Sequence, residues 1–96
     1  MIRNLSGKIT RDVYDGLESR HSRKLPRELH GKARRLLDQI NAALALEVLF
    51  APPANRLEKL HGDRIGYWSL RINNRWRIVF QWEAGAALNV EIIDFH

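Results

Sequence analysis

The chain has 96 residues, which is the size of one domain, and 45% of them are apolar, so a small core can form without covalent staples. It contains no cysteine, which excludes disulfides and thiolate metal sites. Sixteen Lys and Arg against eleven Asp and Glu give a net charge of +5, which favours a polyanionic partner such as nucleic acid over ordinary solubilising charge.

Hydropathy gives no sign of a targeting or membrane segment. No apolar run approaches the length of a membrane span, and no signal-peptide pattern opens the sequence. We therefore expect one cytoplasmic domain over residues 1–96, with no membrane partner.

The first half of the sequence is predicted to be mainly helical. Residues 2–5 suit a short strand, residues 10–18 a short helix with Thr10 as its N-cap, and residues 20–24 a basic linker. Residues 26–49 are predicted to form the main helix, which opens on a proline and is ended by the Pro-Pro pair that follows it. Its apolar stripe consists of Leu29, Ala33, Leu36, Leu37, Ile40, Ala43 and Leu44.

After the loop around His61, the apolar period changes from helical to alternating and predicts three half-buried strands. A three-residue turn at 73–75 would pair Leu70 with Ile78 and keep the apolar side chains together. The same logic at 83–85 would pair Phe80 with Leu88.

This register divides the sheet into an apolar face and a charged face. The apolar face should lie against the helix and holds the rings of Trp68, Trp76, Phe80 and Trp82. The other face carries a cross-strand row of Arg71, Arg77 and Glu91. Two opposed arginines repel unless an anion shares them, and that anion is either Glu91 or a phosphate.

Cleavage of a phosphodiester needs a general acid, a general base and cations near the developing charge. Asp94, His96, His61, Arg71 and Arg77 supply these types, with a histidine two residues from a carboxylate in the final tripeptide. Taken alone, His61 is better explained as a surface loop residue than as a catalytic one. His61, His96 and Asp94 have metal-binding chemistry but no tight ligand spacing, so we expect no metal and no cofactor.

Five segments resemble the HigB toxins, which belong to the RelE/ParE superfamily of bacterial type II toxin–antitoxin systems. They are residues 55–58 (NRLE), 60–64 (LHGDR), 69–73 (SLRIN), 76–78 (WRI) and 90–96 (VEIIDFH). The resemblance extends over essentially the whole chain. It implies an α+β RelE-like fold, with N-terminal helices packed on one face of a small, twisted, mostly antiparallel β-sheet.

The resemblance also implies an activity. HigB toxins are ribosome-dependent mRNA endonucleases that inhibit translation, without a metal, by 2′-hydroxyl attack on the adjacent phosphate in the A site. By position, His96 would be the leading acid/base, Asp94 its close partner, Arg77 the phosphate ligand and His61 a contributor. The substrate-binding residues implied are Phe95, Arg71, Arg64, Lys59 and Tyr67.

The partners implied are a helix-turn-helix antitoxin (HigA-like), the ribosome with mRNA in its A site, and operator DNA reached through the antitoxin. Two positions depart from the family pattern, because Phe95 replaces the usual tyrosine and His61 an often-found lysine. We expect weaker or more pH-dependent cleavage as a result. The alternatives are a non-catalytic ParE-like gyrase inhibitor and a degenerate toxin that acts as an antitoxin-binding regulator.

Overall fold

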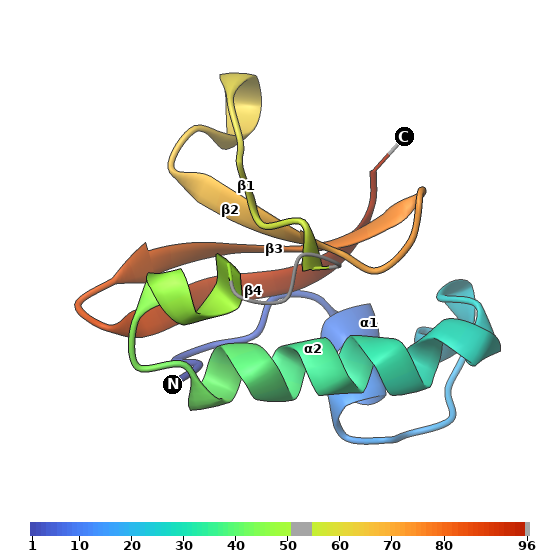
Figure 1. Cartoon of the computed structure of the whole chain (residues 1–96). Coiled ribbons are helices and arrows are strands. Elements are labelled where there is room, and N and C mark those ends of the chain that lie inside the picture. Colours follow the sequence, from blue (N-terminus) through green and yellow to red (C-terminus); the bar gives the residue numbers. More distant parts are fainter. Residues whose placement is uncertain (51–54, 96) are drawn as a thin grey trace.

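Two α-helices lie against one face of a four-stranded antiparallel sheet (Figure 1). The computed structural model describes residues 1–50 and 55–95, so the Pro-Pro pair and His96 lie outside the described residues. The helices are α1 (Lys8–Tyr14) and α2 (His30–Ala42), with 3₁₀ helices η1 (Ser22–Lys24), η2 (Arg27–Leu29), η3 (Leu46–Phe50) and η5 (Gly62–Arg64).

The sheet has the strand order β1-β2-β3-β4, with every neighbouring pair antiparallel. Its strands are β1 (Glu58–Lys59), β2 (Tyr67–Arg71), β3 (Trp76–Glu83) and β4 (Ala86–Asp94). The predicted α+β architecture is confirmed. No helix in the described ranges is long and apolar enough to cross a membrane.

The predicted N-terminal strand is reduced to two isolated parallel bridges beside β4. Ile2 bridges Ala87 and Leu5 bridges Val90. The N–H of Arg3 donates to the carbonyl of Ala87 over 2.8 Å, so the segment continues the sheet past β4.

The first helix differs from its prediction at its start. Gly7, with φ 83°, occupies the N-cap position, and α1 begins at Lys8. Thr10 is buried, and its Oγ1 accepts a hydrogen bond of 2.9 Å from the N–H of Ile92. The prediction of Thr10 as N-cap is wrong because this hydroxyl satisfies the backbone of β4 instead of the helix end.

The main helix is shorter than predicted. Helix α2 ends at Ala42, and Ala43 is extended, with ψ 127°. The N-terminal ammonium of Met1 donates to the carbonyl of Ala43 over 3.3 Å, a favourable place for a positive charge at a helix C-terminus. Leu44 therefore leaves the apolar stripe and is 88% exposed. This tertiary contact is invisible to helical periodicity.

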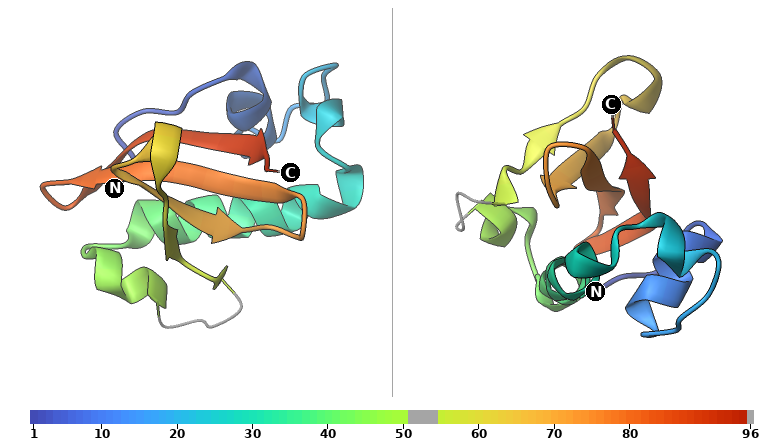
Figure 2. Two further views of the ribbon diagram at one scale, coloured as in Figure 1. Left: turned by 90° about the horizontal axis from the view of Figure 1, so that it is seen from above. Right: turned by 90° about the vertical axis from the view of Figure 1, so that its right-hand side faces the viewer.

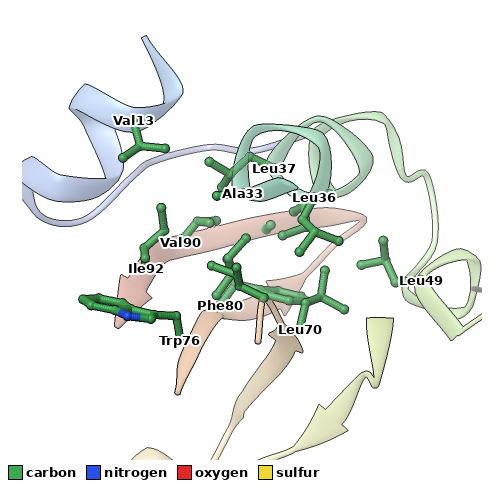
Figure 3. Packing of buried hydrophobic residues seen from close by; sticks show 14 of the residues in the cluster. Val13, Ala33, Leu36, Leu37, Leu49, Leu70, Trp76, Phe80, Val90 and Ile92 are labelled. Atoms are coloured by element: carbon green, nitrogen blue, oxygen red, sulfur yellow. The ribbon is translucent and has the colours of Figure 1, made fainter. Parts of the chain in front are cut away.

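The core lies between α2 and the sheet, as predicted (Figure 3). The helix contributes Ala33, Leu36, Leu37 and Ile40, and the sheet contributes Leu70, Ile78, Phe80, Val90 and Ile92. Trp76 belongs to this cluster, while Trp68 and Trp82 are partly buried against it. The aromatic rings of this face therefore serve packing.

The β2–β3 hairpin has the predicted register. Leu70 pairs with Ile78, and Arg71 lies directly opposite Arg77. Asn73 fixes the turn, because its Oδ1 accepts hydrogen bonds from the N–H groups of Arg75 (2.9 Å) and Trp76 (2.7 Å).

The β3–β4 hairpin does not have the predicted register. Glu83 pairs with Ala86, so the turn has two residues, Ala84 (φ 50°) and Gly85 (φ 77°), as a type I′ turn requires. The extra residue lies further along β4 at Asn89 (φ 53°), where the register shifts opposite Val79–Gln81.

Because of this bulge, two pairings predicted from the sequence are wrong. Glu91 lies opposite Val79, and Arg77 lies opposite Ile93, so the predicted row of Arg71, Arg77 and Glu91 does not exist. On the core side, Ala87 rather than Leu88 belongs to the buried cluster.

Candidate active site

A projecting arm of β1, η5 and the start of β2 stands on the side of the sheet away from the helices, near the end of β4 (Figures 1 and 2). Glu58 pairs with Ser69 and Lys59 with Trp68, and the chain reverses through Gly62 (φ 65°) and Gly66 (φ 89°). Strand β1 was not predicted, because two residues are too short to show alternation.

Two adjoining hollows lie between this arm and the end of β4. The first, of about 320 Å³, is lined by Arg64, Ile93, Asp94 and Phe95. The second, of about 360 Å³, is lined by Leu60, His61, Asp63, Arg64 and Phe95. Because they share Arg64 and Phe95, we treat them together and call them the cleft.

Arg77 lies beside the cleft with few polar contacts. Its side chain is 16% exposed, and Nη1 lies 3.4 Å from Oε1 of Glu58 and 3.5 Å from Oγ of Ser69. Its Cζ lies 5.1 Å from the ring centroid of Phe95. Its buried Nε has no hydrogen-bond partner among residues 1–50 and 55–95.

A guanidinium carries five N–H donors, and a buried donor without a partner costs about 1–3 kcal/mol. Arg77 thus keeps a positive charge against Phe95 with long contacts only. Such a group is suited to an incoming anion, and a phosphate matches its fork geometry.

The partner of Arg71 is in the hairpin turn. Its Nη2 donates to Oδ1 of Asn74, and Arg71 does not line the cleft. The carboxylate that contacts Arg77 is Glu58 of β1 rather than the predicted Glu91. The unpredicted edge strand therefore supplies an anion beside Arg77.

Arg75 is a residue that the sequence interpretation missed. Its Nε lies 3.0 and 2.9 Å from the two carboxylate oxygens of Asp94, and its Nη2 lies 2.7 Å from Oδ2. Its carbonyl accepts a hydrogen bond of 2.6 Å from the N–H of Phe95. Arg75 thus holds the end of β4 against the β2–β3 turn.

The pairing with Asp94 changes the electrostatics of Arg75. The hydrogen bonds to Asp94, and then its negative charge, raise the pKa of Arg75 above its ordinary value. The sequence shows Arg75 only as a cation in a turn. Its pairing with Asp94 can be inferred once the register is known, because Trp76, the next residue, lies opposite Asp94.

The remaining predicted residues divide between the cleft and its surroundings. His61 is exposed at the rim, and the Arg64 guanidinium lies 5.7 Å from the ring centroid of Tyr67. Lys59 lies 6.0 Å from the ring of Trp68, its cross-strand neighbour, and is not among the cleft residues. Lys59 alternates with Glu58, so it points to the opposite face of the sheet.

Within residues 1–50 and 55–95, no three His, Asp or Glu side chains gather closely enough to hold a metal ion. The described cleft instead combines Arg64 and the neighbouring Arg77 with the ring of Phe95 and with Asp94, whose carboxylate is paired with Arg75.

Solved structures share this fold. The YoeB dimer from Staphylococcus aureus superposes with a TM-score of 0.58 at 23% identity, over 97% of this chain and 93% of that chain. The YoeB/ParE toxin from Agrobacterium tumefaciens gives a TM-score of 0.51 at 24% identity, over 97% and 98% of the two chains. At these identities the likeness shows the fold, which is that of the RelE-like toxins.

Sequence comparison identifies the family of RelE-like toxins to which the chain belongs. Residues 8–96 match the model of the HigB-like toxin family, described as RelE-like toxins of the type II toxin–antitoxin system HigB. Toxin HigB-1 of Vibrio cholerae is 40% identical over 72 residues, which are 75% of each chain. The chain therefore belongs to the HigB-like family of type II toxins, as the resemblance predicted.

A shorter match bears on activity. A Proteus vulgaris protein named endoribonuclease HigB is 44% identical over 41 residues, which are 43% of this chain and 45% of that protein.

Proposed function

We propose that this toxin is an endoribonuclease that cuts mRNA on the ribosome and thereby inhibits translation. The name of the Proteus vulgaris relative supports RNA cleavage. The observation that carries the proposal is Arg77, whose buried Nε has no partner in the described ranges and whose guanidinium faces Phe95. A group of this kind is suited to hold the scissile phosphate.

The reaction proposed is attack of a ribose 2′-oxygen on the adjacent phosphorus, with departure of the 5′-oxygen. Negative charge grows on the phosphate oxygens in the transition state, and a preorganised cation beside them is typically worth about 10²–10³ in rate. Arg77 would supply that charge.

Proton transfer needs groups near the phosphate. His96 would be the leading acid/base, because an imidazole can give and take a proton near neutral pH. Asp94 would be its close partner, and the contacts of Asp94 with Arg75 would hold this end of the chain in place. His61 would contribute from the rim of the cleft. These side chains cover acid, base and cation, so the proposal requires no metal.

Substrate binding would use the aromatic and cationic side chains of the cleft. Phe95 is 39% exposed and offers a face on which a base can stack, and Arg64 with Tyr67 offers a second such surface on the arm. Arg71 lies outside the cleft and would add positive charge beside it, and Lys59, on the opposite face of the sheet, would add to the long-range attraction of RNA.

The ribosome would meet the exposed basic residues on the helical side. Arg20, Arg23 and Lys24 are exposed, and they would contact ribosomal RNA in the cytoplasm. As a type II toxin, the protein would be neutralised by a helix-turn-helix, HigA-like antitoxin, through which the pair would reach operator DNA.

The test is primer extension on a message translated in a purified system, with and without ribosomes. The proposal predicts cuts inside codons that appear only with ribosomes. An intact message together with inhibited supercoiling by gyrase would identify a ParE-like poison instead. An intact message with normal gyrase would identify a regulatory remnant, to which the missing hydroxyl of Phe95 and the histidine at position 61 would contribute.

A further inference from the structure

The carboxylates at the cleft differ in their partners. Asp94 accepts hydrogen bonds from Arg75 at 2.7–3.0 Å, and Glu58 lies 3.4 Å from Arg77. The carboxylate of Asp63, which lines the second hollow, forms no ion pair or hydrogen bond with any residue that the structure describes. An unpaired negative charge on the wall of a cleft that takes RNA repels phosphate, so Asp63 is suited to another part of the nucleotide.

We propose that Asp63 is a specificity-determining residue of this toxin, and that it selects guanine as one of the two bases that flank the scissile bond. This inference rests on the proposed endoribonuclease function and deepens it, because it names the base that the second hollow accepts. Arg64, the next residue, would bind the same base.

The second hollow has the composition of a base-binding site. Its apolar wall consists of Leu60, which is 8% exposed, and the ring of Phe95. His61, Asp63 and Arg64 supply its polar groups. Proteins commonly bind an unpaired base by stacking it on an aromatic side chain and forming hydrogen bonds to its edge. The hollow offers both kinds of contact in a volume of about 360 Å³.

The arm presents Asp63 and Arg64 together. They are neighbours in the η5 turn, which the N–H of Arg64 closes by donating to the carbonyl of His61 over 3.4 Å. The N–H of Leu60 donates to the carbonyl of Tyr67 over 2.9 Å, which ties the two sides of the arm. The Arg64 guanidinium lies 5.7 Å from the Tyr67 ring centroid. A carboxylate and a guanidinium therefore reach the hollow from one short turn.

This pair of groups matches guanine. On the Watson–Crick edge of guanine, N1–H and the N2 amino group are adjacent donors, and the two oxygens of a carboxylate can accept from both. Adenine and cytosine offer a single amino group there, and uracil offers one N–H between two carbonyl oxygens, which a carboxylate repels. Guanine also carries O6 beside N1, an acceptor that arginine binds well. Asp63 and Arg64 thus complement guanine better than the other bases.

A purely structural role for Asp63 makes a different prediction. Asp63 lies in a three-residue 3₁₀ helix whose N-cap forms no side-chain hydrogen bond. If Asp63 only favoured this turn, asparagine would replace it without a change in base preference, since asparagine is also a good turn residue. The loss of one negative charge would strengthen binding of every message alike, because phosphate contacts carry no sequence information.

The experiment measures single-turnover cleavage on programmed ribosomes for the wild type, Asp63→Asn, Asp63→Ser and Asp15→Asn. The messages carry each of the four bases in turn at the two positions that flank the cut. One further message carries inosine in place of guanosine, which removes the N2 amino group and keeps N1–H and O6. Asp15→Asn, exposed at the end of α1, is the matched control for the lost charge.

We expect the wild type to cut the message with guanine at one of these positions about 5–100-fold faster than the others, the usual discrimination of one bidentate contact. Inosine at that position should slow cleavage by about 10-fold, because one hydrogen bond to the carboxylate is lost. Asp63→Asn and Asp63→Ser should lose the preference and cut the guanosine and inosine messages at similar rates. Asp15→Asn should keep both differences.

Equal cleavage of all four bases by the wild type, preference for a base other than guanine, or equal rates with guanosine and inosine would overturn the role of Asp63. A guanine preference that both variants keep would overturn it too. Urea unfolding of each variant shows whether the fold is kept, and the comparison with inosine in the wild type needs no variant. Each of these outcomes leaves the nuclease itself intact. If the wild type cuts no message, the proposed function fails, and the role of Asp63 falls with it.

Discussion

Arg75 and Asp94 form a bidentate ion pair that joins the β2–β3 turn to the end of β4, 19 positions further along the chain. Beside it, the carbonyl of Arg75 accepts the N–H of Phe95. The side-chain pair and the backbone bond together fix the orientation of the residues that line the cleft. We infer that Arg75 is a positioning residue.

Arg75→Ala should therefore slow mRNA cleavage by about 10²-fold, the usual effect of a displacement of about 1 Å in a catalytic arrangement. It should lower kcat more than it raises KM. Unfolding in urea should change little, because both side chains are partly exposed and such ion pairs add little stability.

Arg75→Lys provides the internal comparison, since lysine keeps the charge but not the two-pronged geometry, and it should recover part of the rate. Arg3→Ala, an exposed arginine beside the start of β4, at the other end of this strand from Asp94, is the control for net charge. A rate for Arg75→Ala equal to that of the control would show that the pair has no part in positioning.

Arg77→Met should separate stability from activity. The change removes a buried Nε that has no partner in the described ranges, so the free energy of unfolding should stay the same or rise, by about 1–3 kcal/mol at most. Glu58 is left exposed to water and needs no new partner. Cleavage should fall by about 10²–10³-fold.

Urea unfolding and single-turnover cleavage of the same preparation check this prediction. Arg34→Met is the contrast, because the Arg34 guanidinium bonds the carbonyl of Val13 over 3.3 Å and joins α2 to α1, so its loss should destabilise. If Arg77→Met were the more destabilised of the two, Arg77 would be a structural residue.

The β3–β4 turn predicts two opposite changes in stability. Ala84 has φ 50°, a left-handed conformation that costs an alanine about 1–2 kcal/mol and that asparagine tolerates well. Ala84→Asn should therefore raise the free energy of unfolding by about 0.5–1 kcal/mol, since Asn-Gly is the favoured type I′ pair.

Gly85→Ala should lower the free energy of unfolding by about 1 kcal/mol or more, because φ is 77° there. The added Cβ would lie 3.7 Å from the Leu44 carbonyl, an ordinary contact, so the cost is in the backbone. Equal effects of the two substitutions in denaturant unfolding would show that the turn has another form.

The raised pKa of Tyr14 predicts that the free energy of unfolding falls at alkaline pH. Burial raises the pKa of its phenol above 10.0, and the charge of Asp38 and a hydrogen bond to it act in the same direction. The folded state holds this proton more tightly than the unfolded chain does. The contribution of the neutral Tyr14 phenol to the free energy of unfolding is therefore fully present below about pH 10. It is lost as the pH rises through the pKa of the phenol in the folded state.

The free energy of unfolding should thus fall less steeply above pH 10 in Tyr14→Phe than in the wild type. Urea titrations at several alkaline pH values measure both slopes. Parallel curves for the two proteins would mean that Tyr14 titrates normally in the folded state.

The sequence predicted those parts of the fold that depend on local patterning. Alternation placed Leu70 opposite Ile78 and Arg71 opposite Arg77, because the Asn73 turn obeys common turn chemistry. Alternation predicted the wrong register at the β3–β4 hairpin. Alanine is an unusual residue for a left-handed turn position, and no sequence pattern marks the bulge at Asn89 that compensates for the shorter turn.

The sequence predicted which residue types lie at the cleft better than it predicted which of their side chains contact one another. Family resemblance pointed to Arg77, Asp94 and Phe95, and the structure brings Arg77 and Phe95 together. Arg75 and Glu58 were missed as contacts, since one lies in a turn and the other in a two-residue edge strand. Pairings between distant elements depend on register, and the alternating pattern predicts the wrong register for β4.

We propose that this cleft cuts mRNA through the 2′-hydroxyl of the nucleotide before the scissile bond. The most direct measurement uses two ribosome-bound messages, identical except for a single 2′-deoxynucleotide at the cut position. We predict cleavage of the normal message and none at that position in the modified one, with equal binding of the protein to both complexes. Cleavage of the deoxy message at the normal rate would contradict the mechanism, and an intact normal message would contradict the function.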